Sequence, residues 1–205
     1  MSSMPTRRSN ARKTSNIGRA SGEKAFGPYL QHYVIILDFN KDMKSPTDDF
    51  MAQLIKLGYG PNPVPRTIEQ MAAAPADLTA AKDAVDKMEQ GLETRLAKVT
   101  ADRAALKQPD DLKAVYDKTF DKLVVAPAVA FENSAKALSN GIDAALAFVA
   151  YINAHRAKLI VTGMQIQAKD QRTLDEIAPL MKAYQDSGER FAVAQRQSDR
   201  VLQGN

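Results

Sequence analysis

The stretch PADLTAAKDAVDKMEQGLETRLAKVTADRAALKQ, residues 75–108, carries the strongest pattern in the chain. Apolar residues recur in it at strict intervals of seven, at Leu78, Val85, Leu92, Val99 and Leu106. A sustained seven-residue repeat predicts a helix that packs at a shallow left-handed crossing angle against another helix. At ~1.5 Å per residue this helix would be about 50 Å long. The helix-packing repeat therefore predicts an all-α fold built from long amphipathic helices.

The helix that packs against this repeat has two possible sources. We favour an antiparallel helix of the same chain, and an intermolecular coiled coil is the alternative. Arg95 and Asp102 lie on the secondary stripe beside the repeat, where a dedicated coiled-coil seam would carry apolar residues. The two charged residues therefore favour an elongated antiparallel helical bundle.

Residues on the N-terminal side of the repeat predict two shorter helices. Aromatic and aliphatic residues spaced three or four apart predict a helix that begins near Pro28. A second helix is predicted to begin at Ser45 or Thr47, because a hydroxyl group there would cap a first turn that contains Pro46. It would end at a turn over residues 58–65, which hold two glycines and three prolines.

Residues on the C-terminal side predict further helices and one interruption. Pro109 predicts a break, residues 112–124 carry one apolar helical face, and Pro127 is predicted to open another long helix. The stretch LIVTGMQIQ, residues 159–167, predicts an extended connection or a short hairpin. Residues 170–202 predict the last helix, whose inner face would hold Leu174, Ile177, Met181, Tyr184, Phe191 and Leu202.

Charge and composition divide the chain near residue 22. Residues 1–22 contain five basic and no acidic residues, so the net charge of +4 divides into +5 for this segment and −1 for the rest. We predict a disordered basic tail over residues 1–22 and one helical bundle domain over residues 23–205. The nearly neutral bundle domain makes nucleic acid an unlikely partner.

Catalytic motifs are missing from the sequence. The chain has no Cys, and its two histidines, His32 and His155, do not have the spacing of metal ligands. Asp110 and Asp111 are typical of a helix N-terminus, where carboxylates cap and complement the helix dipole. Phosphate-binding loops, dinucleotide fingerprints and nucleophile elbows are also missing. The sequence therefore predicts a protein that is not an enzyme and has no cofactor or metal.

Four aromatic residues near the start of the first helix are candidates for binding. Phe26, Tyr29, Tyr33 and Phe39 are spaced as on one helix, and this spacing favours a place in the core. The alternative is that these four side chains line an apolar groove.

The run ALKQPDDLK, residues 105–113, is followed by further residues of a family hallmark. This hallmark resembles a small bacterial envelope lipoprotein family that is known only as domain of unknown function number three thousand and fifty-three. The resemblance covers roughly residues 24–200. The hallmark residues in this chain are Leu106, Lys107, Asp110, Asp111, Leu112, Phe120 and Pro127.

The resemblance implies a helical protein of the cell envelope or periplasm and implies membrane association. Members of the family are similar to one another in an N-terminal signal, a lipidated Cys and a first amphipathic helix. This chain has a polar run over residues 1–22 instead, so we expect a wrongly assigned start, a frameshift or an added tail. Without the first helix, an apolar groove near Phe26, Tyr29 and Tyr33 would be exposed and would favour self-association or tail binding.

The leading functional prediction is a non-enzymatic, envelope-associated helical protein that acts by scaffolding or partner binding. One alternative is a bundle that carries a small apolar ligand or lipid. The other is a cytoplasmic coiled-coil adaptor, which becomes preferred if the N-terminus is genuine, because the chain as written has no signal peptide.

Overall fold

A computed structural model describes residues 27–56 and 66–203, so the predicted tail and the predicted turn at 58–65 lie outside the described residues. The elements, in chain order, are the 3₁₀ turn η1 (Gly27–Tyr29), the helices α2 (Leu30–Lys56), α3 (Ile68–Ala73), α4 (Pro75–Ala104) and α5 (Asp110–Phe120), the π-helical turn η2 (Asp121–Val125), the helix α6 (Ala126–Ala154), the strands β1 (Leu159–Thr162) and β2 (Gln165–Ala168), and the helix α7 (Gln171–Leu202).

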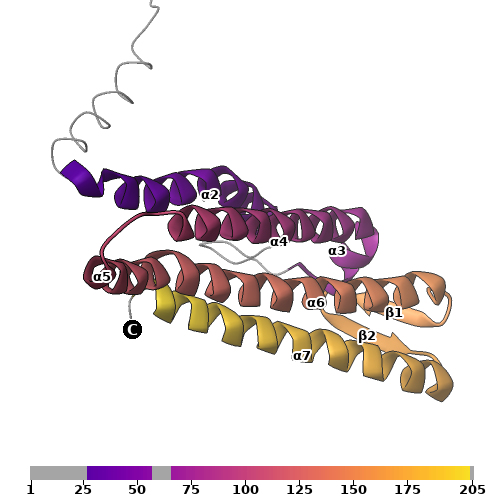
Figure 1. Cartoon of the computed structure of the whole chain (residues 1–205). Helices are drawn as coiled ribbons and strands as arrows, with labels where there is room; N and C mark the ends of the chain where they lie inside the picture. The colour runs from indigo at the N-terminus through magenta and orange to yellow at the C-terminus, as the bar shows by residue number, and fades with distance from the viewer. Residues whose placement is uncertain (1–26, 57–65, 204–205) are drawn as a thin grey trace, which may run out of the picture.

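Four long helices lie side by side along one axis, and each runs opposite to the one before it (Figure 1). Helix α4 contacts both α2 and α6, and α7 packs along α6. Within the described residues, the only β structure is the antiparallel β1–β2 hairpin. The prediction of an all-α, elongated antiparallel bundle is therefore confirmed. None of the helices in the described ranges combines the length and the apolar character that crossing a bilayer requires.

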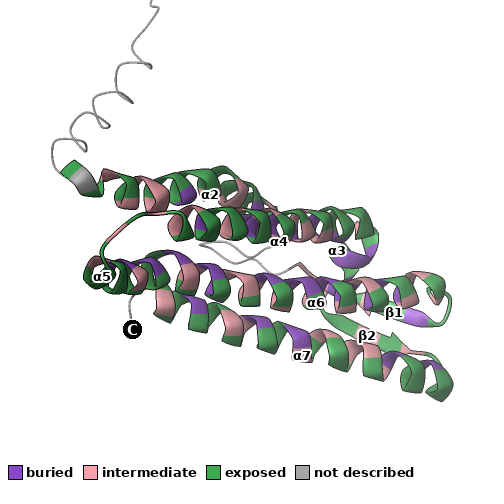
Figure 2. Cartoon of the chain, viewed as in Figure 1, coloured by how far each residue is buried: buried purple, intermediate pink, exposed green. Residues whose placement is uncertain are grey.

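Buried residues recur along the length of α4 (Figure 2), and four residues of the helix-packing repeat are among them. Leu78 and Val85 lie in a core that α4 shares with α6, α7 and the C-terminal part of α2. Leu92 and Val99 lie in a second core, which α4 shares with α2 and α5. Leu106 lies just beyond the end of α4 and packs half-buried against this second core. All five repeat residues thus pack against helices of the same chain.

Helix α2 corrects the prediction that a separate helix begins at Ser45 or Thr47. The helix continues through Pro46, although a proline inside a helix costs about 3 kcal/mol. Thr47, the next residue, donates its hydroxyl hydrogen to the carbonyl oxygen of Met43 at 2.7 Å, one turn back in the same helix. Buried Phe50 and Leu54 continue the inner face of α2, and this packing explains why the helix does not end at Pro46.

The prediction that Pro127 opens a long helix is confirmed by α6, which begins at Ala126 with Pro127 in its first turn, but no break separates α6 from α5. Helices α5 and α6 are joined without a break by η2, a single wide turn in which the amide of Ala126 donates to the carbonyl of Asp121, five residues earlier. Four buried residues along this junction, Tyr116, Phe120, Val124 and Ala128, are spaced by four. In a regular α-helix, side chains four residues apart point in directions that differ by about 40° around the helix axis. The wider π-helical turn reduces this difference, so that all four side chains face the core.

The predicted short hairpin is confirmed, and it is fastened to α3. Gly163 begins the two-residue turn between β1 and β2 with φ of +59°, a left-handed conformation that glycine adopts without strain. The amide of Glu69 donates to the carbonyl of Gly163 at 3.3 Å, and the amide of Gly163 donates to the Glu69 carboxylate at 3.1 Å. The hairpin and α3 therefore close one end of the bundle together.

The inner face of α7 differs from the predicted one at two positions. Leu174 and Leu202 are exposed, whereas Ile177 and Phe191 are buried as expected. Thr173, Ser187 and Ser198 are buried on α7 instead, and Ser187, which lies beside Gly141 of α6, donates its hydroxyl hydrogen to the carbonyl of Tyr184 at 2.7 Å. A search for apolar spacing alone misses such positions, because a hydroxyl that bonds its own helix can be buried.

Glu89 is an acidic side chain between α4 and α6 that is not balanced by a cation. Its buried Oε1 atom has no hydrogen-bond partner among the described residues. Burial, followed by the nearby Asp86 carboxylate, raises the pKa of Glu89, and the cations Lys136 and Lys82 only partly oppose this. Both cations bind other carboxylates, Lys82 that of Asp86 and Lys136 that of Glu132. Glu89 therefore weakens the helix interface when it is ionised.

We expect Glu89→Gln to raise the free energy of unfolding at neutral pH by about 1 kcal/mol. A raised pKa means that the folded state binds the proton more tightly than the unfolded chain. The penalty from Glu89 therefore fades as the pH falls through this raised value toward the ordinary 4.5. Urea unfolding at neutral pH and at about pH 4 should show a gain only at neutral pH. Glu93→Gln, one turn along the exposed side of α4, is the matched control and should change neither value.

Candidate functional site

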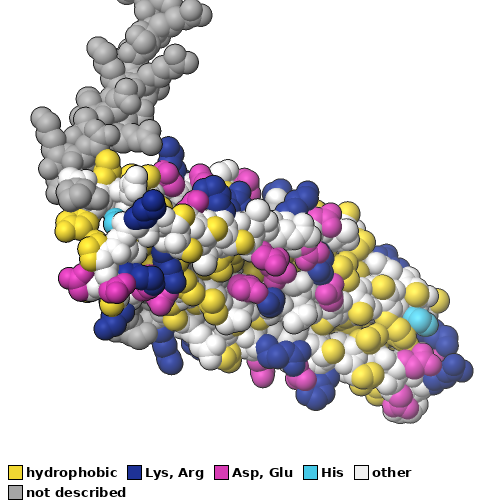
Figure 3. Space-filling model, viewed as in Figure 1, with side chains coloured by type: hydrophobic (Ala, Val, Ile, Leu, Met, Phe, Trp, Pro, Cys, Tyr) yellow, Lys and Arg dark blue, Asp and Glu magenta, His cyan; other side chains and the backbone are white. Residues whose placement is uncertain are grey.

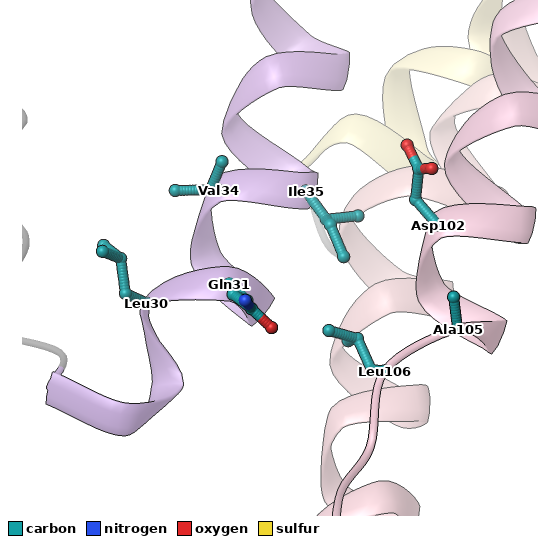
Figure 4. Close-up of a pocket in the computed structure, with 7 residues that line it drawn as sticks. All are labelled: Leu30, Gln31, Val34, Ile35, Asp102, Ala105 and Leu106. Atoms are coloured by element: carbon teal, nitrogen blue, oxygen red, sulfur yellow. The ribbon is translucent and has the colours of Figure 1, made fainter.

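An open pocket lies between the first turns of α2 and the end of α4 (Figure 4). Its cavity volume is about 500 Å³. Gln31 and Ile35 point from α2 toward α4, and Leu106 points back toward α2. Among the described residues its lining, which we call the end pocket, is Leu30, Gln31, Val34, Ile35, Asp102, Ala105 and Leu106. The end pocket is therefore mainly apolar, with one amide and one carboxylate.

A smaller hollow of about 80 Å³ continues along the seam between α2 and α4. Five charged side chains border it, the carboxylates of Asp38, Asp42 and Asp102 and the cations of Arg95 and Lys98. The Nζ of Lys98 lies 2.6 Å from the Asp102 carboxylate, and this hydrogen bond is the main cause of the raised pKa of Lys98. With three acids and two bases, the seam has a slight negative excess beside the end pocket.

A polar network behind the end pocket joins α2 to α5. The Tyr116 hydroxyl donates to the carbonyl of His32 at 3.0 Å, and the ring of Tyr116 meets the imidazole edge to face at 4.7 Å. The His32 Nε2 lies 2.7 Å from the Gln108 side-chain carbonyl, which can only accept, so Nε2 carries the hydrogen. The Nδ1 atom of His32 is buried and has no partner among the described residues. Burial raises the pKa of Tyr116 and keeps its hydroxyl a donor.

A second network fixes the end of α4 to the π-helical turn. The Arg103 guanidinium lies 3.0 Å from Asp121, 3.4 Å from Asp117 and 4.7 Å above the ring centre of Phe120. A hydrogen bond from Lys113, reinforced by Arg103, holds the pKa of Asp117 below its usual value. Because Arg103 is one turn before Leu106, this network holds the wall of the end pocket in place.

The family hallmark residues divide between this wall and the core. Leu106 lines the pocket, Phe120 is buried, and Leu112 and Pro127 are half-buried. Lys107, Asp110 and Asp111 are exposed around the first turn of α5. Asp111 accepts a hydrogen bond from the amide of Leu112 at 2.8 Å, and the N-cap position is taken by Pro109.

Of the four aromatic residues singled out in the sequence, the three that the structure describes are not brought together in the end pocket. Phe26 lies outside the described residues, and Tyr29 in η1 and Tyr33 in α2 are both exposed. Phe39 is buried in the second core and borders only the smaller hollow. Sequence analysis missed the aliphatic residues that line the end pocket, Leu30, Val34 and Ile35, although they lie in the same run.

The chemistry that this arrangement supports is noncovalent binding. The described lining of the pocket contains no hydroxyl or thiol nucleophile, and no group of three or more His, Cys, Asp or Glu in the described ranges is placed to hold a metal ion. On the face shown in Figure 3, basic and acidic side chains are interspersed, and apolar side chains gather where α2 begins. Such a site fits an apolar group with a neighbouring positive charge.

Comparisons with known proteins place the chain in a family. Residues 12–199 match the family model described as "Protein of unknown function (DUF3053)". The match covers most of the chain, so the chain belongs to this family, as the hallmark residues predicted. It begins at residue 12, inside the segment that we predict to be a tail.

Curated relatives are uncharacterised proteins of enteric bacteria. The uncharacterized protein YiaF of Escherichia coli K12 is 26% identical over 113 residues, which are 55% of this chain and 46% of the relative. Proteins of the same name from Escherichia coli O157:H7 and Shigella flexneri match with the same values. The chain thus matches less than half the length of these relatives. No solved structure matches the chain.

Proposed function

We propose that this member of the DUF3053 family is a non-enzymatic helical scaffold of the cell envelope that binds a partner protein in the end pocket. The observation that carries the proposal is the pocket itself, a mainly apolar cavity of about 500 Å³ between the first turns of α2 and the end of α4. Its occupant would be an apolar side chain presented by a partner helix, as in grooves that bind amphipathic helices. A basic residue beside that side chain would meet the carboxylates of Asp38, Asp42 and Asp102.

The two networks behind the pocket support a binding role. Preformed sites lose less entropy on binding than flexible ones, and both pocket walls are fixed by bonds between different helices. His32, Gln108 and Tyr116 hold the α2 wall, and Arg103 with Asp121 holds the α4 wall. The envelope location rests on the resemblance of the hallmark residues. Fractionation of cells that express the native gene tests it, and recovery in the cytosol alone would contradict it.

A small-molecule carrier is the second candidate, and the pocket volume favours it. Ligand pockets usually measure about 300–1,000 Å³ and are mostly apolar, as the end pocket is. The third candidate, a coiled-coil adaptor, loses its support because the helix-packing repeat packs against helices of the same chain.

One pair of variants separates the first two candidates. Ala105→Trp should fill the end pocket, whereas Ala104→Trp puts the same side chain beside the pocket, and both positions are exposed. A photo-crosslinker at Gln31 in living cells should give one defined protein adduct that Ala105→Trp reduces at least about tenfold, the equivalent of ~1.4 kcal/mol. Ala104→Trp should leave the adduct unchanged.

The same variants report on a carried ligand. If native mass spectrometry of the purified protein shows a small apolar adduct that only Ala105→Trp removes, and no protein crosslink forms, the carrier replaces the scaffold. If Gln31 gives no adduct of either kind, or if both tryptophan variants behave alike, the end pocket is not the binding site and the proposal fails.

A further inference from the structure

The described lining of the end pocket contains one charged side chain, that of Asp102. Asp102 on α4 and Ile35 on α2 border both the end pocket and the smaller hollow, so they lie where the apolar cavity meets the charged seam (Figure 4). From this position we propose that Asp102 selects a positively charged group in the segment that fills the end pocket, and that Lys98 competes with this group for the carboxylate. The selection rests on the proposed function, because it concerns the occupant of the same pocket.

The position of Asp102 is one at which a helix disfavours a carboxylate. Asp102 lies in the last turn of α4, which ends at Ala104, and the C-terminal end of the helix dipole attracts cations and repels anions. It also lies on the stripe beside the helix-packing repeat, where an apolar residue would pack better. Residues that break local preferences in this way are expected at functional sites. A cation bound to Asp102 would offset the unfavourable interaction with the dipole.

Lys98 supplies this cation in the free protein through a bond that is easily exchanged. Its Nζ atom lies 2.6 Å from Oδ2 of Asp102, one turn along the same helix. The Lys98 side chain is 72% exposed, so water and salt weaken the pair. A lysine four residues before an acid is also the less favourable order of such a pair on a helix. A second cation that enters together with an apolar group can therefore displace Lys98.

Two further carboxylates attract the displaced lysine. Asp38 and Asp42 of α2 border the smaller hollow together with Lys98. The hydrogen bond to Asp102 is the main cause of the raised pKa of Lys98, and the charges of Asp42 and Asp38 raise this pKa further. Lys98 thus remains close to negative charge when Asp102 binds the occupant, and the exchange costs less than separating a cation from every partner.

The chemistry of the selected occupant follows from this arrangement. Its apolar part would fill the cavity, and a positive charge at the end of that part would reach Asp102 at the border of the seam. An aliphatic side chain with a neighbouring Lys or Arg fits this description, whereas an acidic neighbour would be repelled. Because Lys98 holds the same carboxylate, removal of the Lys98 charge should strengthen the binding of a cation and leave the binding of a neutral group unchanged.

Three octyl probes test the selection, because n-octylammonium, 1-octanol and octanoate share one alkyl chain and differ in charge. Each is titrated at low ionic strength into the full-length protein labelled with ¹⁵N, and binding is followed at the backbone amide of Leu106, which lines the pocket. Octylammonium should bind about threefold more tightly than octanol, which is within the range for an exposed ion pair, and octanoate should bind most weakly. Ala105→Trp, which fills the pocket, should abolish binding of all three probes at this position.

Two pairs of variants separate these contacts from the general effect of charge. Asp102→Asn should remove the preference for octylammonium over octanol, whereas Asp42→Asn removes the same charge from the smaller hollow alone and should keep it. Lys98→Gln should strengthen octylammonium binding about twofold. Arg95→Gln removes the same charge from the same hollow and should have little effect. The Arg95 guanidinium lies one turn back on α4, where a Cβ atom added at Gly91 would be 2.5 Å from its Nη1.

A double variant completes the test of competition. The gain from Lys98→Gln should vanish when it is combined with Asp102→Asn, because the contested carboxylate is then missing. A gain that persists in the double variant, or equal gains from Lys98→Gln and Arg95→Gln, would show that Lys98 acts only through the general field and would overturn the competition.

The selection by Asp102 has its own contrary results. It is overturned if octylammonium does not bind at Leu106, if octanol binds the parent protein equally well, or if Asp42→Asn removes the preference as fully as Asp102→Asn does. These results are distinct from a failure of the proposed function, which is measured by the crosslink from Gln31 in cells. A protein can form that crosslink although the pocket has no preference for cations, and octylammonium can bind through Asp102 although no protein is crosslinked.

Discussion

Deleting Ala147 from α6 is expected to abolish folding, whereas deleting Leu123 from the π-helical turn is expected to leave a folded protein. Both residues are exposed, so neither deletion removes a core side chain. Beyond Ala147, a one-residue deletion rotates the rest of α6 by about 100°. Phe148, Val149 and Ile152, all fully or nearly fully buried, would then leave the core. At about 2–5 kcal/mol each, these losses equal the whole stability of a typical domain.

The deletion of Leu123 has a different effect because η2 already contains one residue more than a regular turn. Its removal places Val124 three residues after Phe120, with Ala128 four residues further on. Steps of four, three and four are the spacing that an ordinary α-helix needs to keep one face toward the core. We therefore expect a loss of under about 2 kcal/mol.

Circular dichroism and urea unfolding of the two deletion variants provide the measurement. The variant without Leu123 should retain the helical signal and a cooperative transition, and the variant without Ala147 should lose both. If both deletions unfold the protein, the π-helical turn is required for packing, and a regular α-helix cannot replace it. If both are tolerated, the register of α6 against α4 and α7 is not what holds the bundle together.

The same junction shows where prediction from sequence succeeds and where it fails. The seven-residue repeat in α4 identifies an α-helix, because its spacing is close to two regular turns. The run Tyr116, Phe120, Val124, Ala128 has a strict spacing of four, which no regular helix keeps on one face. This spacing of four could have predicted the π-helical turn η2. Pro127 favoured a separate helix start instead, because proline is common in the first turn of a helix.

Pro46 predicted a helix start that the structure does not have. Local preferences set a helix boundary there, but packing of Phe50 and Leu54 against other helices outweighs the local cost. Such contacts join residues far apart in the sequence, and a single sequence does not reveal them. The exposed Leu174 and the buried Ser187 on α7 reflect the same limit.

The end pocket could be predicted only in part. The sequence predicted an apolar groove at Phe26, Tyr29, Tyr33 and Phe39, and the end pocket lies near them at the start of α2 but is lined by other residues. The second wall of the pocket is formed by Ala105 and Leu106, where the chain leaves the end of α4. The ion pair of Arg103 with Asp121 holds this end of α4 in place, and the sequence alone does not show that contact. Spacing in the sequence does not distinguish the aliphatic side chains that line the pocket from the aromatic ones beside them, because both belong to the same helical run.

Phe120→Ala is expected to cost about 3–5 kcal/mol in the free energy of unfolding. Phe120 is fully buried at the point where α4, α5 and the π-helical turn meet. The Tyr116 ring lies 6.1 Å away and the Arg103 guanidinium 4.7 Å above the ring, so truncation leaves a cavity and removes a cation–π contact. Val115→Ala, on the exposed side of α5, is the matched control and should stay within about 0.5 kcal/mol of the parent.

The further consequence of Phe120→Ala concerns the pocket. Without the ring, Arg103 loses the surface that supports its bonds to Asp117 and Asp121, so the α4 wall should loosen. At a temperature where the variant is still folded, the crosslink from Gln31 should fall with Phe120→Ala and not with Val115→Ala. Phe120→Leu keeps much of the volume but not the aromatic face. If it restores stability without restoring the crosslink, Arg103 is held by the ring, and the pocket depends on that contact in addition to core packing.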